Sequence, residues 1–487
     1  MSTETVIFAG VGVYIVIMLG VGIWASRRTH SVTEFIVAGR GLPLGICTAT
    51  VIATWFGGGT MLGTSGSAYQ YGMLGIIADP FGSALCLFLV GFFFARLFRR
   101  LRILTVADFM AQRYGQVAAM AITFTTLFSN IMWVGGMLVA FGLIFESLTG
   151  TPFVTGVFGG ALVIVVYTAI GGLWAVALTD FLQLTIIVIG LVILLAVVLI
   201  DVGGWSAVSS RLPEGTFRFI PGENTWEQWL NYLRAWMIIG LVDISAQTLT
   251  QRALAAKSER VAQNSFYLGG VGYLVFGMIP PILGLIASVT MPDLADPESL
   301  IPVLAIEYLH PVAVAIFVGA LLAAIMSSSD SALLACSSVI TQNVLPLIKR
   351  NPSTRLGLIV ARLAIPACAI VSIAIAMIFQ VVFDLILDAN ILGMAAIIVP
   401  FIMGVWWTKA NRTGALSAMA AGLAAWLVTM LLMPSWPADF IGLGTSLLTM
   451  LVVTPLTQKI DPPRPLVDSE GNPVEMKDRL GTLGFGS

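Results

Sequence analysis

The sequence predicts an all-α membrane protein with about thirteen transmembrane helices. Hydrophobic residues make up 58% of the 487 residues and charged residues only 10%, whereas a soluble protein has roughly 25% charged residues. Apolar runs of about 20 residues, long enough to cross a bilayer core as helices, recur along the chain. Basic residues gather in alternate loops, as they do in a chain threaded repeatedly through a lipid bilayer.

The first expected span, 6–26, has no basic residue ahead of it and no small-residue cleavage site, so we interpret it as a retained helix. The thirteen spans are expected at 6–26, 43–71, 74–98, 119–147, 153–172, 180–202, 229–251, 266–290, 312–345, 358–381, 384–406, 412–433 and 438–457.

The distribution of basic residues predicts the orientation of the chain. Of the 24 Lys and Arg residues, all but Arg211, Arg218 and Arg234 fall in or beside the loops after odd-numbered spans, or in the C-terminal tail. Basic loops face the cytoplasm. We therefore expect the N-terminus outside and the C-terminus inside a plasma or inner membrane, with a tail from about Lys459 that lacks fixed structure.

The second span carries "ATWFGGGTMLGTSG" (53–66), with three consecutive glycines at its middle. Each glycine costs a helix interior roughly 1 kcal/mol relative to alanine. Close helix packing is one explanation, but a consecutive run also unwinds a helix. Unwound backbone at membrane depth is tolerated where it lines a cavity, and its free carbonyls can then coordinate a cation.

A broken helix near the start of such a chain favours a transporter built from inverted repeats of five spans each. The counterpart in the second repeat is span seven, "LRAWMIIGLVDISAQTLTQR" (233–252), which carries Gly240, Asp243 and Gln247. The expected division is an extra helix and cytoplasmic loop at 1–42, the first repeat at 43–202, an extracellular loop at 203–228, the second repeat at 229–407, two further helices at 408–457 and a cytoplasmic tail at 458–487.

Carboxylates inside the spans are costly, by at least roughly 2.5–3.5 kcal/mol each, so their default interpretation is functional. Asp79 lies before Pro80 at the start of a span, where helix capping explains it. Asp180 suits either an N-cap or an ion ligand. Asp243 and Asp330 lie too far from the ends of their spans for capping.

The ninth span places polar groups together in "AAIMSSSDSALLACSS" (323–338). Ala324, Ser327, Ser328 and Ser331 follow the i, i+3, i+4, i+7 rule and share one helix face, with Asp330 beside it. Serine hydroxyls alone often bond back to their own helix. No Lys or Arg is expected at that depth to balance the carboxylate, so sodium, which accepts an all-oxygen ligand set, is the simplest partner. A proton on Asp330 is the rival.

Other classes of site find little support. The four cysteines lie in apolar stretches and the two histidines in apparent loops, which argues against disulfides and histidine metal sites. No basic run suits nucleic acid, no nucleophile–base pair suggests an enzyme, and no organic cofactor is implied.

Taken together, the motifs resemble the sodium:solute symporter family over nearly the whole chain. "TVADFMAQRYG" (105–115), "GGLWAVALTDFLQ" (171–183) and "TQRALAAKS" (250–258) are similar to family elements, as is the serine-rich stretch at 323–338. The resemblance implies a LeuT-type five-plus-five inverted repeat.

Residue by residue, the resemblance implies two ion sites. The sodium site would comprise the carbonyls of Ala53, Phe56 and Ala324 with the hydroxyls of Ser327 and Ser328. A possible second sodium site would comprise Asp180, Asp330 and Ser331.

Within the family, "ATWFGGGTMLGTSGSAY" and "NIMWVGG" look most similar to the choline-transporting branch. Trp55 and Trp133 match two positions of its aromatic cage, in which cation–π attraction holds a quaternary ammonium. The two other cage positions carry Ala246 and an aliphatic residue near Leu385. The expected substrate-binding residues are Trp55, Gly57, Gly58, Trp133, Asp243 and Gln247.

The function expected from the resemblance is sodium-coupled symport of a small organic solute into the cell by alternating access. An organic cation or amine is weakly favoured, because Asp243 could pair with a protonated amine. A proton-coupled or uncoupled carrier on the same scaffold is the alternative. A membrane ligand sensor is disfavoured, because the short tail holds no signalling domain.

Overall fold

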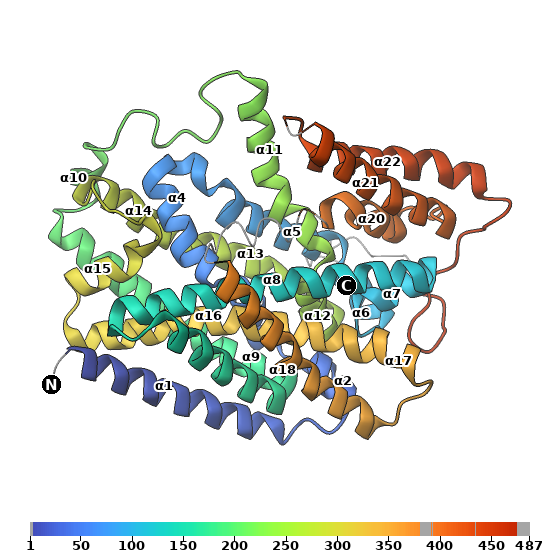
Figure 1. Cartoon of the computed structure of the whole chain (residues 1–487), viewed down its shortest axis with the longest axis horizontal. Coiled ribbons are helices and arrows are strands. Elements are labelled where there is room, and N and C mark those ends of the chain that lie inside the picture. Colours follow the sequence, from blue (N-terminus) through green and yellow to red (C-terminus); the bar gives the residue numbers. More distant parts are fainter. Residues whose placement is uncertain (1–2, 380–390, 392, 434, 475–487) are drawn as a thin grey trace.

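The computed structural model describes residues 3–379, 391, 393–433 and 435–474, and this part of the chain is almost wholly helical with no β-strand. Figure 1 shows the helices in one bundle, with α1 along one side and α20, α21 and α22 together on the opposite side. The predicted all-α class is confirmed.

The elements follow the two expected repeats. The first contains α3 (Leu44–Ala53), η2 (Gly59–Gly63), α4 (Thr64–Tyr71), η3 (Gly72–Ile76), η4 (Ile77–Gly82), α5 (Ser83–Phe93), α6 (Ala95–Leu101), α7 (Val106–Tyr114), α8 (Gln116–Thr149) and α9 (Phe153–Asp201). The second contains α11 (Trp226–Gly240), η5 (Val242–Ser245), α12 (Gln247–Ala255), α13 (Glu259–Gly277), α14 (Ile279–Thr290), η6 (Pro297–Ser299), α15 (Leu300–Tyr308), α16 (Pro311–Val339), η7 (Ile340–Val344), α17 (Leu345–Ile348), α18 (Thr354–Ile378) and α20 (Ile398–Trp406).

The remaining helices flank the repeats. They are α1 (Thr3–Ser26), α2 (Val32–Val37) and η1 (Ala38–Arg40) before them, α10 (Trp205–Ser209) between them, and α21 (Arg412–Leu432) and α22 (Ala438–Thr457) after them. The helices α21 and α22 pack against each other, whereas α1 packs against α9 and α16.

Both predicted helix breaks are present. The backbone leaves the helix after Ala53 and resumes it at Gly58, so Thr54–Gly57 forms a turn in the middle of the second span. Span seven is divided into α11, the short η5 and α12, with extended backbone at Ala246. The two interruptions face the interior of the bundle, beside α16, which is the most buried of the long apolar helices.

The fifth and sixth expected spans meet inside α9, which consists of two helices divided by a kink at Gly172, where φ is +59° and ψ is −156°. The second helix begins directly after this kink, earlier than the expected start at 180. A Cβ on Gly172 would lie 2.7 Å from the Phe35 carbonyl oxygen. Glycine is therefore required both by the left-handed φ and by the close approach of α2.

Eight helical stretches of the described residues are long and apolar enough to cross a membrane. This number is not a count of spans. The stretches Gly59–Phe93 and Phe153–Asp201 each contain parts of two expected spans, broken helices contribute shorter pieces, and residues 380–390 and 392 lie outside the described residues. The count of thirteen stays a prediction.

The expectation of an unstructured tail from Lys459 is wrong for residues up to 474. The backbone N–H of Ser469 donates to the Leu101 carbonyl at 3.1 Å, and Arg102 forms a 3.0 Å salt bridge with Glu470. Complementary charge and backbone hydrogen bonding therefore hold this segment against the loop that follows α6.

Candidate functional site

The turn after α3 lies directly against the serine-rich part of α16. A Cβ on Gly57 would lie 2.2 Å from the Ser328 hydroxyl oxygen and 3.4 Å from the Ala324 carbonyl oxygen. A side chain at position 57 would therefore displace Ser328, and glycine is what allows the turn and α16 to touch.

One hydrogen-bond contact joins the two elements that carry the predicted sodium site. The Ser327 hydroxyl lies 3.1 Å from the Ala53 carbonyl oxygen, which ends α3. The Ser328 hydroxyl is buried and has no hydrogen-bond partner in the part of the chain that the structure describes. Phe56, a further residue of the predicted site, is fully buried in the turn after α3. A buried polar group without a partner costs about 1–3 kcal/mol, and a bound cation would satisfy it.

The neighbouring carboxylates have a positive partner, contrary to the expectation that no Lys or Arg lies at this depth. Arg252, in α12, is fully buried, and its guanidinium lies 3.8 Å from the Asp180 carboxylate. It also donates a hydrogen bond to the Ser331 hydroxyl, which in turn donates to Asp330 at 3.2 Å. The sequence analysis assigned Arg252 to a cytoplasmic loop, but α12 continues past it to Ala255.

Hydroxyl groups complete this network. Asp180 accepts hydrogen bonds from Thr50 and, at 2.5 Å, from Ser327, whereas Asp330 accepts one from Tyr167. Asp180, Asp330 and Ser331 therefore do lie together, as the second-site hypothesis requires. Arg252 is present within the same cluster.

Two cavities meet at the breaks in the helices. The first has an empty volume of about 710 Å³ and lies between the turn after α3, α8, η5 and α12. The second, of about 600 Å³, lies among η2, α4, η4 and α13. Three residues line both of them: Trp55, Trp133 and Asp243.

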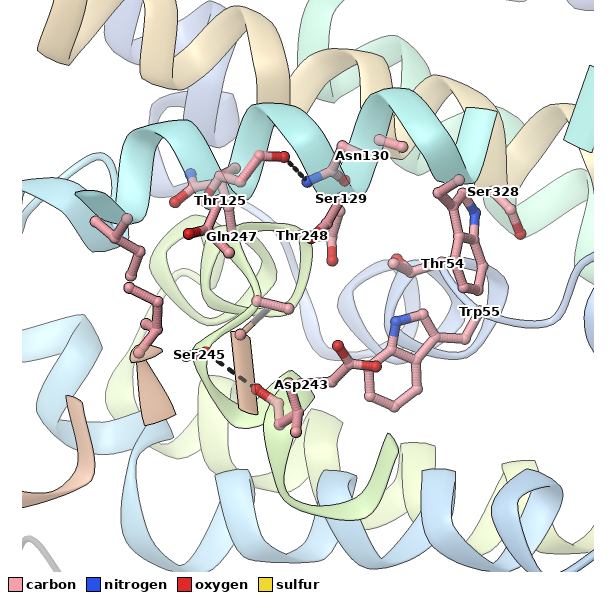
Figure 2. A pocket seen from close by; sticks show the side chains of 18 residues that line it. Thr54, Trp55, Thr125, Ser129, Asn130, Asp243, Ser245, Gln247, Thr248 and Ser328 are labelled. Atoms are coloured by element: carbon pink, nitrogen blue, oxygen red, sulfur yellow. Dashed lines mark hydrogen bonds between the residues drawn. The ribbon is translucent and has the colours of Figure 1, made fainter. Parts of the chain in front are cut away.

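The first cavity has a polar wall on α8 and an aromatic and acidic one opposite. Figure 2 shows Thr125, Ser129 and Asn130 along α8, with the Asp243 carboxylate next to the Trp55 indole. Such a cavity combines a π face with a negative charge, the two features that attract an organic cation.

The other predicted substrate residues are placed differently. Gln247 lines the first cavity, but its amide accepts from Val106 N–H at 2.8 Å and donates to the Leu104 carbonyl at 3.3 Å. Gly57 and Gly58 line neither cavity and face α16 and α8 instead. Through these two hydrogen bonds, Gln247 joins α12 to the start of α7.

Of the two cage positions without tryptophan, Ala246 lines the first cavity, where its small side chain leaves space. The position near Leu385 lies outside the described residues.

The sequence analysis missed one acidic residue of the cavities. Asp79 was interpreted as a helix cap, but α5 begins after Gly82 and has no side-chain cap, while Asp79 lines the second cavity and accepts a 2.5 Å hydrogen bond from Thr60. The sequence next to Pro80 does not indicate that Asp79 lines a cavity, because its partners Thr60 and Tyr273 meet it only through tertiary packing.

Comparison with known proteins gives consistent results. The model of the family described as "Sodium:solute symporter family" matches residues 35–422. A high-affinity choline transporter of Drosophila melanogaster is 30% identical over 429 residues, covering 84% of this chain and 69% of the relative. A sodium/pantothenate symporter of Escherichia coli is 29% identical over 438 residues, covering 84% of this chain and 87% of the relative. The structure of a Na⁺-coupled sialic acid symporter superposes with a TM-score of 0.80 at 18% identity, covering 93% of this chain and 98% of that one.

Proposed function

The chain belongs to the sodium:solute symporter family, and from that premise we propose that it carries a small organic cation into the cell together with sodium. Membership makes it a multi-pass membrane protein that couples movement of a small solute to sodium. The identity of the solute and the residues that bind it and the ion are the proposed part.

The proposed sodium site consists of the carbonyls of Ala53, Phe56 and Ala324 with the hydroxyls of Ser327 and Ser328. Its support is the contact of Ser327 with Ala53 and the buried, unpartnered Ser328 hydroxyl. A sodium ion there joins the turn after α3 to α16. Because the turn carries Trp55, the ion also orders one wall of the substrate cavity.

The proposed substrate site is centred on Trp55, Trp133 and Asp243, and one observation carries this proposal: they are the residues shared by the two cavities. An ammonium group over two indole rings gains roughly 0.5–2 kcal/mol from each. The Asp243 carboxylate adds a charge of the opposite sign. The choline-transporting relative supports the proposal that the solute is a cation. The pantothenate-transporting relative shows that membership of the family does not by itself determine the charge of the solute.

Two cavities on either side of one group of residues are suited to alternating access. In our proposal the second cavity communicates with the outside and the first with the cytoplasm, with the N-terminus outside the plasma membrane and the C-terminus inside. Sodium enters down its gradient, and the membrane potential adds about 2.3 kcal/mol per charge for each 100 mV. In the state that is closed towards the cytoplasm, Gln247 would hold α7 against α12 and so stabilise that closure.

The test is the thermal stability of the purified protein with choline, methylammonium or pantothenate, each in sodium and in potassium. Ligands that bind only the folded state raise its melting temperature by mass action. We expect one of the two cations, and not the acid, to do so, and to do so more strongly in sodium.

Asp243→Asn should abolish this stabilisation, and Asp201→Asn, an exposed aspartate at the end of α9, should leave it intact. Stabilisation by pantothenate alone, or by choline equally in both variants, would refute the assignment of an organic cation to this site.

A further inference from the structure

Asp79 has no basic partner among the residues that the structure describes. Within the same residues, its Oδ1 atom is buried without a hydrogen-bond partner. Five salt bridges occur within the described residues, and none involves Asp79. Asp180, by contrast, has Arg252 3.8 Å away. An ionised carboxylate held in the protein interior is costly without a counter-charge, and a bound cation would supply that charge at Asp79.

Oxygen atoms from three separate elements surround the other side of this carboxylate. The Thr60 hydroxyl, in η2, lies 2.5 Å from Asp79 Oδ2, 2.6 Å from the Tyr273 hydroxyl and 3.1 Å from the Trp55 carbonyl oxygen. The Tyr273 hydroxyl, in α13, lies 3.4 Å from Asp79 Oδ2. Thr60 and Tyr273 are buried.

We propose that the Trp55 carbonyl, the Thr60 and Tyr273 hydroxyls and the Asp79 carboxylate form a second alkali-cation site, which takes sodium and is separate from the Ser327–Ser328 site. The chemistry of the ligands supports this, because hard cations select carboxylate, carbonyl and hydroxyl oxygens. One negative charge among three neutral oxygens matches a monovalent ion.

Hydrogen bonding alone leaves this cluster incompletely satisfied. The Thr60 hydroxyl is shared among Trp55 O, Asp79 Oδ2 and the Tyr273 hydroxyl, and the Ser83 hydroxyl also lies beside Asp79. Within the described residues, no hydrogen bond reaches Asp79 Oδ1. A cation needs no donated proton and would bind all four groups at once. The second cavity, which Thr60, Asp79 and Tyr273 line, gives it a route.

The two cation sites would share the turn after α3. Ala53 and Phe56 belong to the first site, whereas Trp55 and Thr60 belong to the second. The ring of Tyr273 packs edge-on against Phe56 with centroids 5.8 Å apart, so the second site is also tied to the first through a side chain. This inference requires that the protein bind sodium, but it does not depend on which solute is carried.

The experiment counts bound sodium ions on the purified full chain without organic substrate, by equilibrium binding of radioactive sodium. We expect Asp79→Asn to bind one ion fewer than the unaltered protein. Tyr273→Phe and Thr60→Val, which keep shape and remove one hydroxyl each, should raise the sodium concentration needed to fill that ion's site. Asp293→Asn, an exposed aspartate after α14, is the matched control and should change nothing.

Two results would overturn the inference. The first is an unchanged sodium count in Asp79→Asn; if that variant also loses stabilisation by methylammonium, the site binds substrate instead of an ion. The second is unchanged sodium affinity in both hydroxyl variants, which tests the inference even if Asp79→Asn does not fold. Ser328→Ala separates this inference from the first site, because it should weaken binding of a different ion and leave the affinity of the ion at Asp79 unchanged.

Discussion

The Arg252 guanidinium and the Asp180 carboxylate lie 3.8 Å apart with neither side chain exposed. The pair joins α12, from the second repeat, to α9, from the first. The Arg252 guanidinium also donates to Ser331 on α16. One cation therefore connects three helices around the predicted ion sites.

Removing Arg252 should destabilise the protein severely. Arg252→Leu leaves Asp180 and Asp330 buried without their positive partner, and breaking a buried pair in this way costs about 3–5 kcal/mol. Arg252→Leu combined with Asp180→Asn should recover part of that loss, because it removes the stranded charge. Denaturation of the purified variants measures both values, and a double variant as unstable as the single one would show that the two charges are not coupled.

Ser328→Ala should weaken sodium binding while leaving the fold intact. The Ser328 hydroxyl has no hydrogen-bond partner among the described residues, so its removal should delete a proposed ion ligand without breaking a hydrogen bond seen in the structure. Loss of about 1.4 kcal/mol corresponds to a tenfold higher half-saturating sodium concentration, which sodium titration of uptake would measure.

Ser329→Ala is the control for this change, because the Ser329 hydroxyl donates back to the Ile325 carbonyl of its own helix at 2.7 Å. Equal sodium dependence in the two variants would place the ion elsewhere.

Ala246→Trp should shift recognition towards small quaternary ammonium compounds. Ala246 lines the first cavity, and an indole there adds a third π face worth about 0.5–2 kcal/mol, or roughly 2- to 30-fold in affinity. Choline binding by calorimetry would measure this gain. Ala246→Leu fills similar space without a π face, so a gain as large in the leucine variant would attribute the effect to packing.

Asn343→Asp should weaken the contact between η7 and the start of α7. The Asn343 amide donates to Asp108 at 2.8 Å and accepts from Thr105 at 2.9 Å, and this joins η7 to the start of α7. Two carboxylates at that distance repel each other, which should lower the melting temperature. Adding Asp108→Asn should reverse part of the loss, with a coupling of about 0.5–3 kcal/mol in the double-mutant cycle. Additive effects would mean that the two side chains do not interact.

The sequence predicted those features that leave a local signature. Three consecutive glycines, Gly57 to Gly59, indicated the first break, and polar residues around Asp243 indicated the second; both breaks are present. The spacing of Ser327 and Ser328 from Ala324 predicted the helix face that meets the first break.

The features that the sequence did not reveal depend on distant contacts. Arg252 looked like one of many cytoplasmic basic residues, and only the continuation of α12 to Ala255 places it inside the bundle. Asp79 looked like a cap, because the approach of Tyr273 from α13, nearly 200 positions later, has no counterpart in local spacing. The docking of residues up to 474 similarly depends on Leu101 and Arg102.

The turn Thr54–Gly57 has a thermodynamic consequence for the order in which ligands bind. Thr54 and Phe56 keep the hydrogen bond to the fourth preceding residue that fixes a helix, whereas Trp55 and Gly57 do not. Fixing a free residue costs about 1–2 kcal/mol of conformational entropy. The first ligand that orders the turn therefore binds with that cost included in its free energy, whereas a second ligand binds to a turn that is already ordered. Cooperativity between solute and ion can therefore arise from a shared loss of disorder, even where the two never touch.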